Sequence, residues 1–215
     1  MLGKYIFSPL RREESQSVSE AQLHFDAGIE LATKGLYPKA LAELKLAVRA
    51  NPTCAETRVE LGRIYHKMGQ FDKAIKTYLS ALGLHPNFVT AYTNLGAAYD
   101  KRGEFVSALK VYTKAIMLAP QDPELRIDLG LAYFNIGSYA EAIKAYRQAL
   151  LIDPDNVRAH YFLGFVYIDL NDTEMALAQH KELKMRNETE LAFQLLDEIQ
   201  RQAGSRQHCA ERPRP

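Results

Sequence analysis

The sequence contains little cysteine and no apolar run long enough to cross a membrane. Only Cys54 and Cys209 occur, far apart and without the close spacing of a metal-binding pair. Two free thiols are typical of a reducing compartment, so we expect a cytoplasmic protein. The first residues hold only a short apolar stretch before Pro9 and the charged residues 11–14, which predicts no secretory signal. No segment reaches the roughly 18 apolar residues of a membrane span, so we expect no membrane insertion.

A strong charge of either sign is also missing, because 27 Lys and Arg oppose 26 Asp and Glu. The net charge of +1 gives no general attraction to nucleic acid or to an anionic membrane, and we expect no nucleic-acid partner. The sequence has no phosphate loop, no dinucleotide glycine fingerprint and no metalloprotease helix motif. We therefore predict a protein that is not an enzyme and that holds no cofactor and no metal.

Two histidines are candidate metal ligands, which the expectation of no metal has to take into account. His160 and His180 occupy positions filled by aromatic residues two repeats earlier, so they could approach each other within one helix pair. A facing pair could bind metal or respond to pH. No third ligand is evident, and histidines that replace packed aromatic residues are the favoured interpretation.

A period of 34 residues runs through most of the chain. Glycines, alanines and prolines each recur at this step, at positions Gly28, Gly62, Gly96, Gly130 and Gly164; Ala40, Ala74, Ala108, Ala142 and Ala176; and Pro52, Pro86, Pro120 and Pro154. Three independent columns with one period predict a tandem repeat whose recurring residues serve packing.

Each repeat is predicted to hold two helices. In the third repeat, Leu95 and Gly96 share one face of the first helix, and Gly103 supplies the freedom that a tight turn needs. Ala108 then lies on the inner face of a second helix, which Pro120 helps to end. Small residues such as Gly96 and Ala108 are expected where two helices cross closely.

The pattern of the central repeats resembles the tetratricopeptide repeat family. The residues that carry the resemblance are Leu61-Gly62, Tyr65, Gly69, Phe71, Ala74, Tyr78, Ala81 and Pro86, with the matching sets Leu95-Gly96 to Pro120 and Leu129-Gly130 to Pro154. The family's tryptophan near the start of each repeat is replaced by Arg58, Tyr92 and Arg126. The resemblance implies an all-α, right-handed superhelical solenoid and a non-enzymatic scaffold or adaptor that binds other proteins.

The chain divides into repeats and flanking segments. We predict an N-terminal extension of flexible character over 1–20, five repeats over 21–54, 55–88, 89–122, 123–156 and 157–188, a capping helix over 189–203 and a disordered basic tail over 204–215. The outer repeats depart from the family pattern; in the last repeat, for example, Asn171 replaces the turn glycine. Such departures are expected in a terminal repeat, because one of its sides has no neighbouring repeat.

The resemblance also implies that the first helices line a concave groove that binds a partner peptide or helix. Two groups of side chains are predicted to face it: a polar, mainly acidic group of Asp26, Glu60, Asn94 and Asp128, and an apolar group of Leu131, Phe134, Tyr161, Phe162, Phe165 and Ile168. Such a surface suits a segment with basic and apolar anchors. A clamp for the C-terminal carboxylate of chaperones is not expected, because Glu124 and Asp128 would repel it.

Other interpretations of these residues stay open. The acidic residues could be ordinary solvated positions, and the apolar group could be covered by the protein's own tail. The apolar group could instead drive self-association, which would make the chain a building block of a larger assembly. The chain could also be an accessory, recruiting subunit of an enzyme or chaperone complex.

Overall fold

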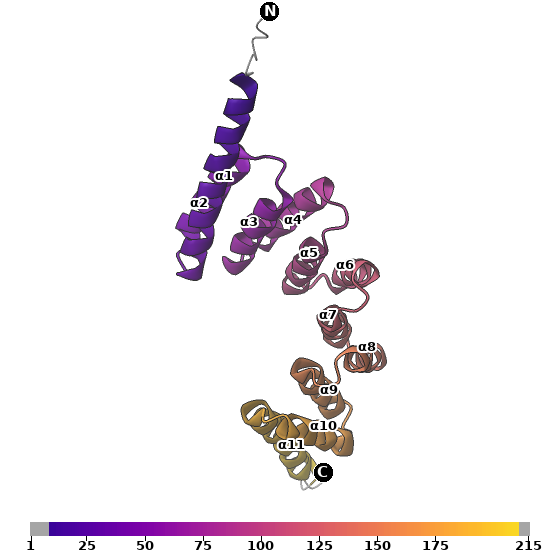
Figure 1. Ribbon diagram of the computed structural model, residues 1–215. Helices are drawn as coiled ribbons and strands as arrows, with labels where there is room; N and C mark the ends of the chain where they lie inside the picture. Colours follow the sequence, from indigo (N-terminus) through magenta and orange to yellow (C-terminus); the bar gives the residue numbers. More distant parts are fainter. Residues whose placement is uncertain (1–8, 211–215) are drawn as a thin grey trace, which may run out of the picture. The chain divides into compact units, whose positions relative to one another are not determined.

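A computed structural model describes the backbone of residues 9–210 and the side chains of residues 20–204. All regular structure in that part of the chain is helical (Figure 1). Its helices are α1 (Pro9–Thr33), α2 (Tyr37–Ala50), α3 (Ala55–Lys67), α4 (Phe71–Leu84), α5 (Val89–Lys101), α6 (Phe105–Leu118), α7 (Pro123–Asn135), α8 (Tyr139–Ile152), α9 (Val157–Asp169), α10 (Thr173–Met185) and α11 (Thr189–Ala210). The predicted all-α architecture of tandem helix pairs is confirmed. None of these helices is both long and apolar enough to cross a membrane.

The chain forms two compact units, residues 1–104 with α1 to α5 and residues 105–215 with α6 to α11. The core of the first unit gathers around Ala40, Leu44, Leu61 and Ile64, with side chains of α1 packed against it. The core of the second unit is larger and runs from α7 to α11. Burial of these apolar side chains is the main driving force for folding of each unit.

The recurring small residues allow helices to approach closely, as the sequence predicted. A Cβ atom added to Gly62 would lie 2.5 Å from a ring carbon of Tyr78, and one added to Gly130 would lie 2.7 Å from Tyr146. Gly28 stands in the same relation to Leu44, at 2.7 Å. The five alanines of the repeated column are fully buried. Any larger side chain at these sites would separate the two helices of a pair.

The turns between paired helices repeat one backbone conformation. Gly103 has a φ of 76°, in the left-handed region that glycine enters at little cost, which confirms its predicted role in the turn. Asn171 occupies the same place in the last repeat with a φ of 64°. Asparagine tolerates this region better than most residues, so it keeps the turn where glycine is missing.

The last helix pair is closed by α11 rather than completed within itself. A Cβ atom added to Gly164 of α9 would lie 2.6 Å from Leu195 of α11, which therefore takes the place that Tyr146 holds against Gly130. His180 of α10 instead places its Nδ1 atom 2.8 Å from the carbonyl oxygen of Ala192. The capping role that the sequence predicted for this helix has its physical basis in these contacts.

Both terminal helices are longer than the sequence suggested. Helix α1 begins at Pro9, within the predicted flexible extension 1–20, and α11 continues to Ala210, into the predicted disordered tail 204–215. Residues 11–22 contain no glycine or proline that would stop a helix. The polar composition of residues 1–20 therefore placed the predicted start of the first helix too late in the sequence. Residues 1–8 and 211–215 lie outside the described part of the chain.

Candidate functional site

The candidate groove residues lie on first helices but differ in exposure. Asp26 is exposed, and Ile168 is buried with 4% of its surface accessible. The others are half-buried, namely Glu60, Asn94, Asp128, Leu131, Phe134, Tyr161, Phe162 and Phe165. Only part of the predicted surface is therefore open to a partner.

The apolar group on α9 is covered in part by the protein's own α11. The hydroxyl of Tyr161 donates a hydrogen bond to Gln194 Oε1 at 3.1 Å, and Ile168 joins the same buried core as Leu195 and Ile199. The placement of Ile168 on an open groove was wrong, because Ile168 is 4% exposed and packs in one core with Leu195 and Ile199 of α11. Phe134 and Phe165 also contact this core but stay half-exposed.

In the second unit, the two acidic side chains of α7 are neutralised by other side chains of the chain. The guanidinium of Arg158 forms ion pairs with Glu124 and, at 3.3 Å, with Asp128. Asn156 Nδ2 donates a second hydrogen bond to Glu124, at 2.8 Å. Burial raises the pKa of Asp128 above its usual value, although Arg158 opposes this effect. Arg158 also lies over the ring of Phe162, 5.8 Å from its centroid. Because Arg158 already pairs with Asp128, this carboxylate is not an unoccupied site for a basic residue.

The acidic residues of the first unit have partners too. Arg63 Nη1 donates to both carboxylate oxygens of Glu60, at 2.8 and 2.9 Å, and Asp26 accepts a hydrogen bond from Gln22 at 2.8 Å. Asn94 donates to the carbonyl oxygen of Thr90 one helical turn earlier. Arg63 therefore neutralises Glu60, whereas the partner of Asp26 is a neutral amide that does not compensate its charge.

An apolar hollow of the first unit lies between α1 and α3. It encloses about 490 Å³ and is lined by Phe25, Ile29, Ala32, Thr33, Tyr37, Glu60, Arg63, Ile64 and Lys67. Of these residues, the sequence had selected only Glu60 as a candidate. The repeat alignment could have indicated Ile29. This residue occupies the same position of its repeat as Arg63, Leu131 and Phe165 do in later repeats. An apolar residue of that column in the first repeat merited the same attention as those in the last two.

Basic side chains lie at the Lys67 end of this hollow. Burial lowers the pKa of His66 against a hydrogen bond to the backbone of Ala97 that raises it, and the nearby ammonium groups of Lys67 and Lys101 lower it further. His66 is therefore neutral at pH 7. Among the described residues neither lysine makes an ion pair, whereas Arg63 is engaged by Glu60.

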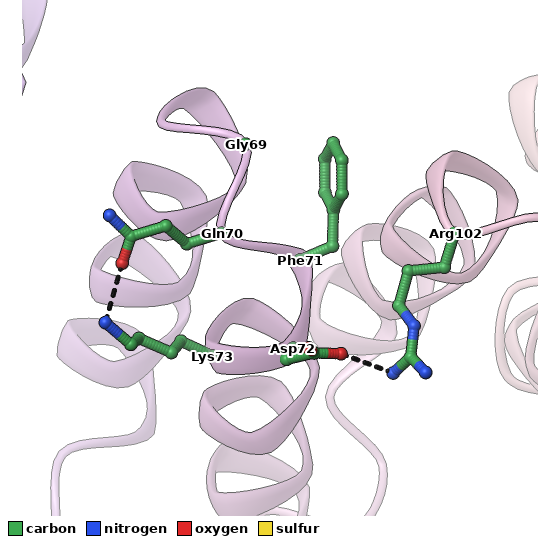
Figure 2. A pocket seen from close by; sticks show the side chains of 6 residues that line it. All are labelled: Gly69, Gln70, Phe71, Asp72, Lys73 and Arg102. Carbon is green, nitrogen blue, oxygen red and sulfur yellow. Dashed lines mark hydrogen bonds and ion pairs between the residues drawn. The ribbon is translucent and has the colours of Figure 1, made fainter.

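A second hollow of about 370 Å³ opens at the start of α4 (Figure 2). Asp72 and Arg102 face each other across it, with Oδ1 and Nη1 2.7 Å apart, and Lys73 donates to Gln70 at 2.9 Å. Asp72 and Arg102 thus neutralise each other, Lys73 is hydrogen-bonded to a neutral amide, and the lining includes only one large apolar side chain, Phe71. It is a weaker candidate for binding than the hollow between α1 and α3.

His160 and His180 have separate protein partners. His160 places Nδ1 2.9 Å from Gln179 Oε1 and Nε2 3.1 Å from the carbonyl oxygen of Pro154, in a buried position. Across the described side chains, no group of three or more His, Cys, Asp or Glu is placed to hold a metal ion. The geometry favours the packing interpretation of both histidines over a ligand pair.

Comparison with known proteins links these observations to a family. The tetratricopeptide repeat profile matches residues 89–122, and a second profile for the same type of repeat matches residues 62–103 and 132–171. None of the curated proteins matches the chain.

Solved structures provide similar folds. A crystal structure of MamA is 28% identical over 76% of this chain and 95% of its own, with a TM-score of 0.67. MamA from Desulfovibrio magneticus RS-1 is 25% identical, with 80% and 95% of the two chains covered and a TM-score of 0.68. The thermophilic repeat protein TTC0263 of Thermus thermophilus is 24% identical, with coverages of 83% and 98% and a TM-score of 0.67, and this likeness shows the fold alone.

Proposed function

Because the chain is a tetratricopeptide repeat protein, we propose that it is a non-enzymatic scaffold that binds a segment of another protein on the exposed face of its first helices. The observation that carries this proposal is the hollow of about 490 Å³ between α1 and α3, with apolar side chains at its floor and charged ones at its edge. Concave apolar sites with a few polar groups are typical of ligand binding. The scaffold would act in the cytoplasm, and recruitment to an enzyme or chaperone complex is one form that its function could take.

Half-exposed aromatic residues of the second unit supply a smaller additional surface. Phe134 and Phe165 lie on first helices and are not enclosed by α11. The rings of Tyr161 and Phe165 contact edge to face, with centroids 4.9 Å apart, which holds both in fixed positions. We assign them a supporting role, because a part of each side chain is already packed against the core.

A pull-down with matched variants tests this proposal. Ile29→Asp places a charge in the apolar hollow, whereas Leu23→Asp places the same charge on α1 at a side chain that is already 68% exposed. We expect Ile29→Asp to lose partners that the wild type and Leu23→Asp both retain, and Phe134→Ala with Phe165→Ala to weaken them less. Identical partner lists for all four proteins would contradict binding at this face.

Self-association is a second candidate function, favoured by a separate observation. Met117, Leu151 and Met185 occupy the same position of α6, α8 and α10, and 70%, 83% and 63% of their surfaces are exposed. The first two repeats have Arg49 and Gly83 at this position, so the apolar column belongs to the second unit alone. Exposed apolar residues that recur on one face suit an interface between copies.

Light scattering over a range of concentrations tests this candidate. A mass that rises with concentration in the wild type, falls to the monomer value in Leu151→Asp and is unchanged in Ala140→Asp would support it. Ala140 is an exposed residue of the same helix, three turns before Leu151, and provides the matched control. A monomeric wild type at all concentrations would exclude self-association through this column.

A further inference from the structure

The hollow between α1 and α3 has an apolar floor and a rim of uneven charge. Phe25, Ile29 and Ile64 form the floor, and Glu60, Arg63 and Lys67 are the charged side chains of its lining. Glu60 and Arg63 compensate each other, because one Arg63 nitrogen contacts both carboxylate oxygens. Lys67 remains as an exposed ammonium group with no ion pair in the described part of the chain.

The surroundings of Lys67 include a second ammonium group, and no carboxylate of the described residues forms an ion pair with Lys67. Lys101 lies near the same imidazole as Lys67, and the pKa of His66 is lowered, so this imidazole carries no charge at pH 7. The acidic side chains on the facing helix are engaged elsewhere, since Glu30 pairs with Lys34 at 2.5 Å and Asp26 accepts from Gln22. Two like charges without partners favour an anionic group brought by a ligand.

We propose that this hollow takes a large apolar side chain of a partner segment and that Lys67 pairs with an acidic residue beside it. Ile64 and Lys67 are three positions apart on α3, so their side chains lie on one face within roughly 6 Å of each other. The partner's carboxylate therefore lies close to its apolar side chain in sequence or one helical turn from it, on either side. The charge of this partner segment is opposite to that of the basic segment expected from the acidic residues in the sequence. The inference depends on the proposed scaffold function, which it makes specific.

A selection from displayed random peptides tests this chemistry. The wild type, Lys67→Glu and the control Lys39→Glu are each used as the target, since Lys39 is an exposed lysine of α2 outside the hollow. We expect the wild type and Lys39→Glu to enrich peptides that join a large apolar residue to Asp or Glu. Lys67→Glu should bind those peptides about tenfold more weakly and enrich Lys or Arg in their place.

The outcomes separate this inference from the function beneath it. Enriched peptides that carry basic residues, or a preference that Lys67→Glu does not change, would overturn the assigned chemistry and leave the scaffold function standing. Peptides whose binding is unaffected by Ile29→Asp would show that they bind elsewhere, and a selection that enriches no peptide on the wild type would overturn both proposals. Circular dichroism of each variant confirms that a loss of binding does not reflect a loss of helix.

Discussion

Two glycines, each replaced by alanine in a separate variant, distinguish the effect of close helix packing on stability from the effect of helix propensity. Gly62 lies in α3, where an added Cβ atom would stand 2.5, 2.7 and 2.9 Å from three ring atoms of Tyr78. Gly83 lies in α4, where an added Cβ atom would meet nothing within 4 Å. Both changes give the helix a residue with a better intrinsic propensity, by up to about 1 kcal/mol. Only the first also inserts a methyl group into a packed contact.

The magnitude follows from these distances. Carbon atoms pack best at about 3.5 to 4.0 Å, so the ring of Tyr78 would have to move by about 1 Å. Tyr78 is 1% exposed, so neighbouring side chains would have to move with its ring. Overpacking of this kind costs about 1 to 3 kcal/mol. We therefore expect Gly62→Ala to be less stable than Gly83→Ala by about 1 to 3 kcal/mol, because the propensity gains largely cancel.

Urea unfolding followed by circular dichroism at the helix band measures this difference. Gly83→Ala is expected to raise the midpoint slightly or leave it unchanged, and Gly62→Ala is expected to lower it. Equal dependence of the unfolding free energy on urea concentration would show that both variants expose the same surface area on unfolding. A Gly62→Ala protein as stable as Gly83→Ala would refute the packing role assigned to the repeated glycine.

Three further changes probe the turn, the capping helix and the buried carboxylate. Asn171→Gly relieves a residue held at a φ of 64° and should stabilise the chain by about 0.5 kcal/mol in urea unfolding, whereas a lower midpoint would contradict strain at this turn. Leu195→Ala removes a fully buried side chain of α11 and should cost about 2 to 5 kcal/mol and increase binding of a hydrophobic dye; a loss below about 1 kcal/mol would show that α11 is not needed to cover α9. Burial raises the pKa of Asp128, so the folded state disfavours its charged form, and the wild type should gain stability relative to Asp128→Asn as pH falls from neutral through the acidic range. A stability difference between these two proteins that does not vary with pH would contradict the raised pKa.

Much of the fold could be predicted from the sequence because its constraints are local and repeated. The spacing of Gly62, Ala74 and Pro86, recurring every 34 residues, encodes a close helix crossing, a buried face and a helix end in each repeat. The packing of Tyr78 on Gly62 is the direct result. The limits of α1 and α11 were less predictable, because a polar stretch extends a helix as readily as it ends one, and α11 continues even through Gly204.

The candidate site was harder to predict because it depends on pairing between repeats. Arg158 is one repeat after Glu124 in the same column, and only the stacking of α7 and α9 brings the two side chains into contact. The burial of Ile168 depends on α11, a helix outside the repeats whose Leu195 takes the place of a repeated aromatic residue. Comparing each column for opposite charges would have found the first contact, whereas no periodic signal indicates the second.

Nuclear magnetic resonance of isoleucine methyl groups tests the proposed binding site most directly. The protein is titrated with a peptide selected on the wild-type chain. We expect the methyl signals of Ile29 and Ile64, which line the hollow between α1 and α3, to shift on binding, while those of Ile75 and Ile127 in the cores of the two units do not. Shifts confined to isoleucines outside the hollow, with Ile29 and Ile64 unchanged at saturation, would contradict it.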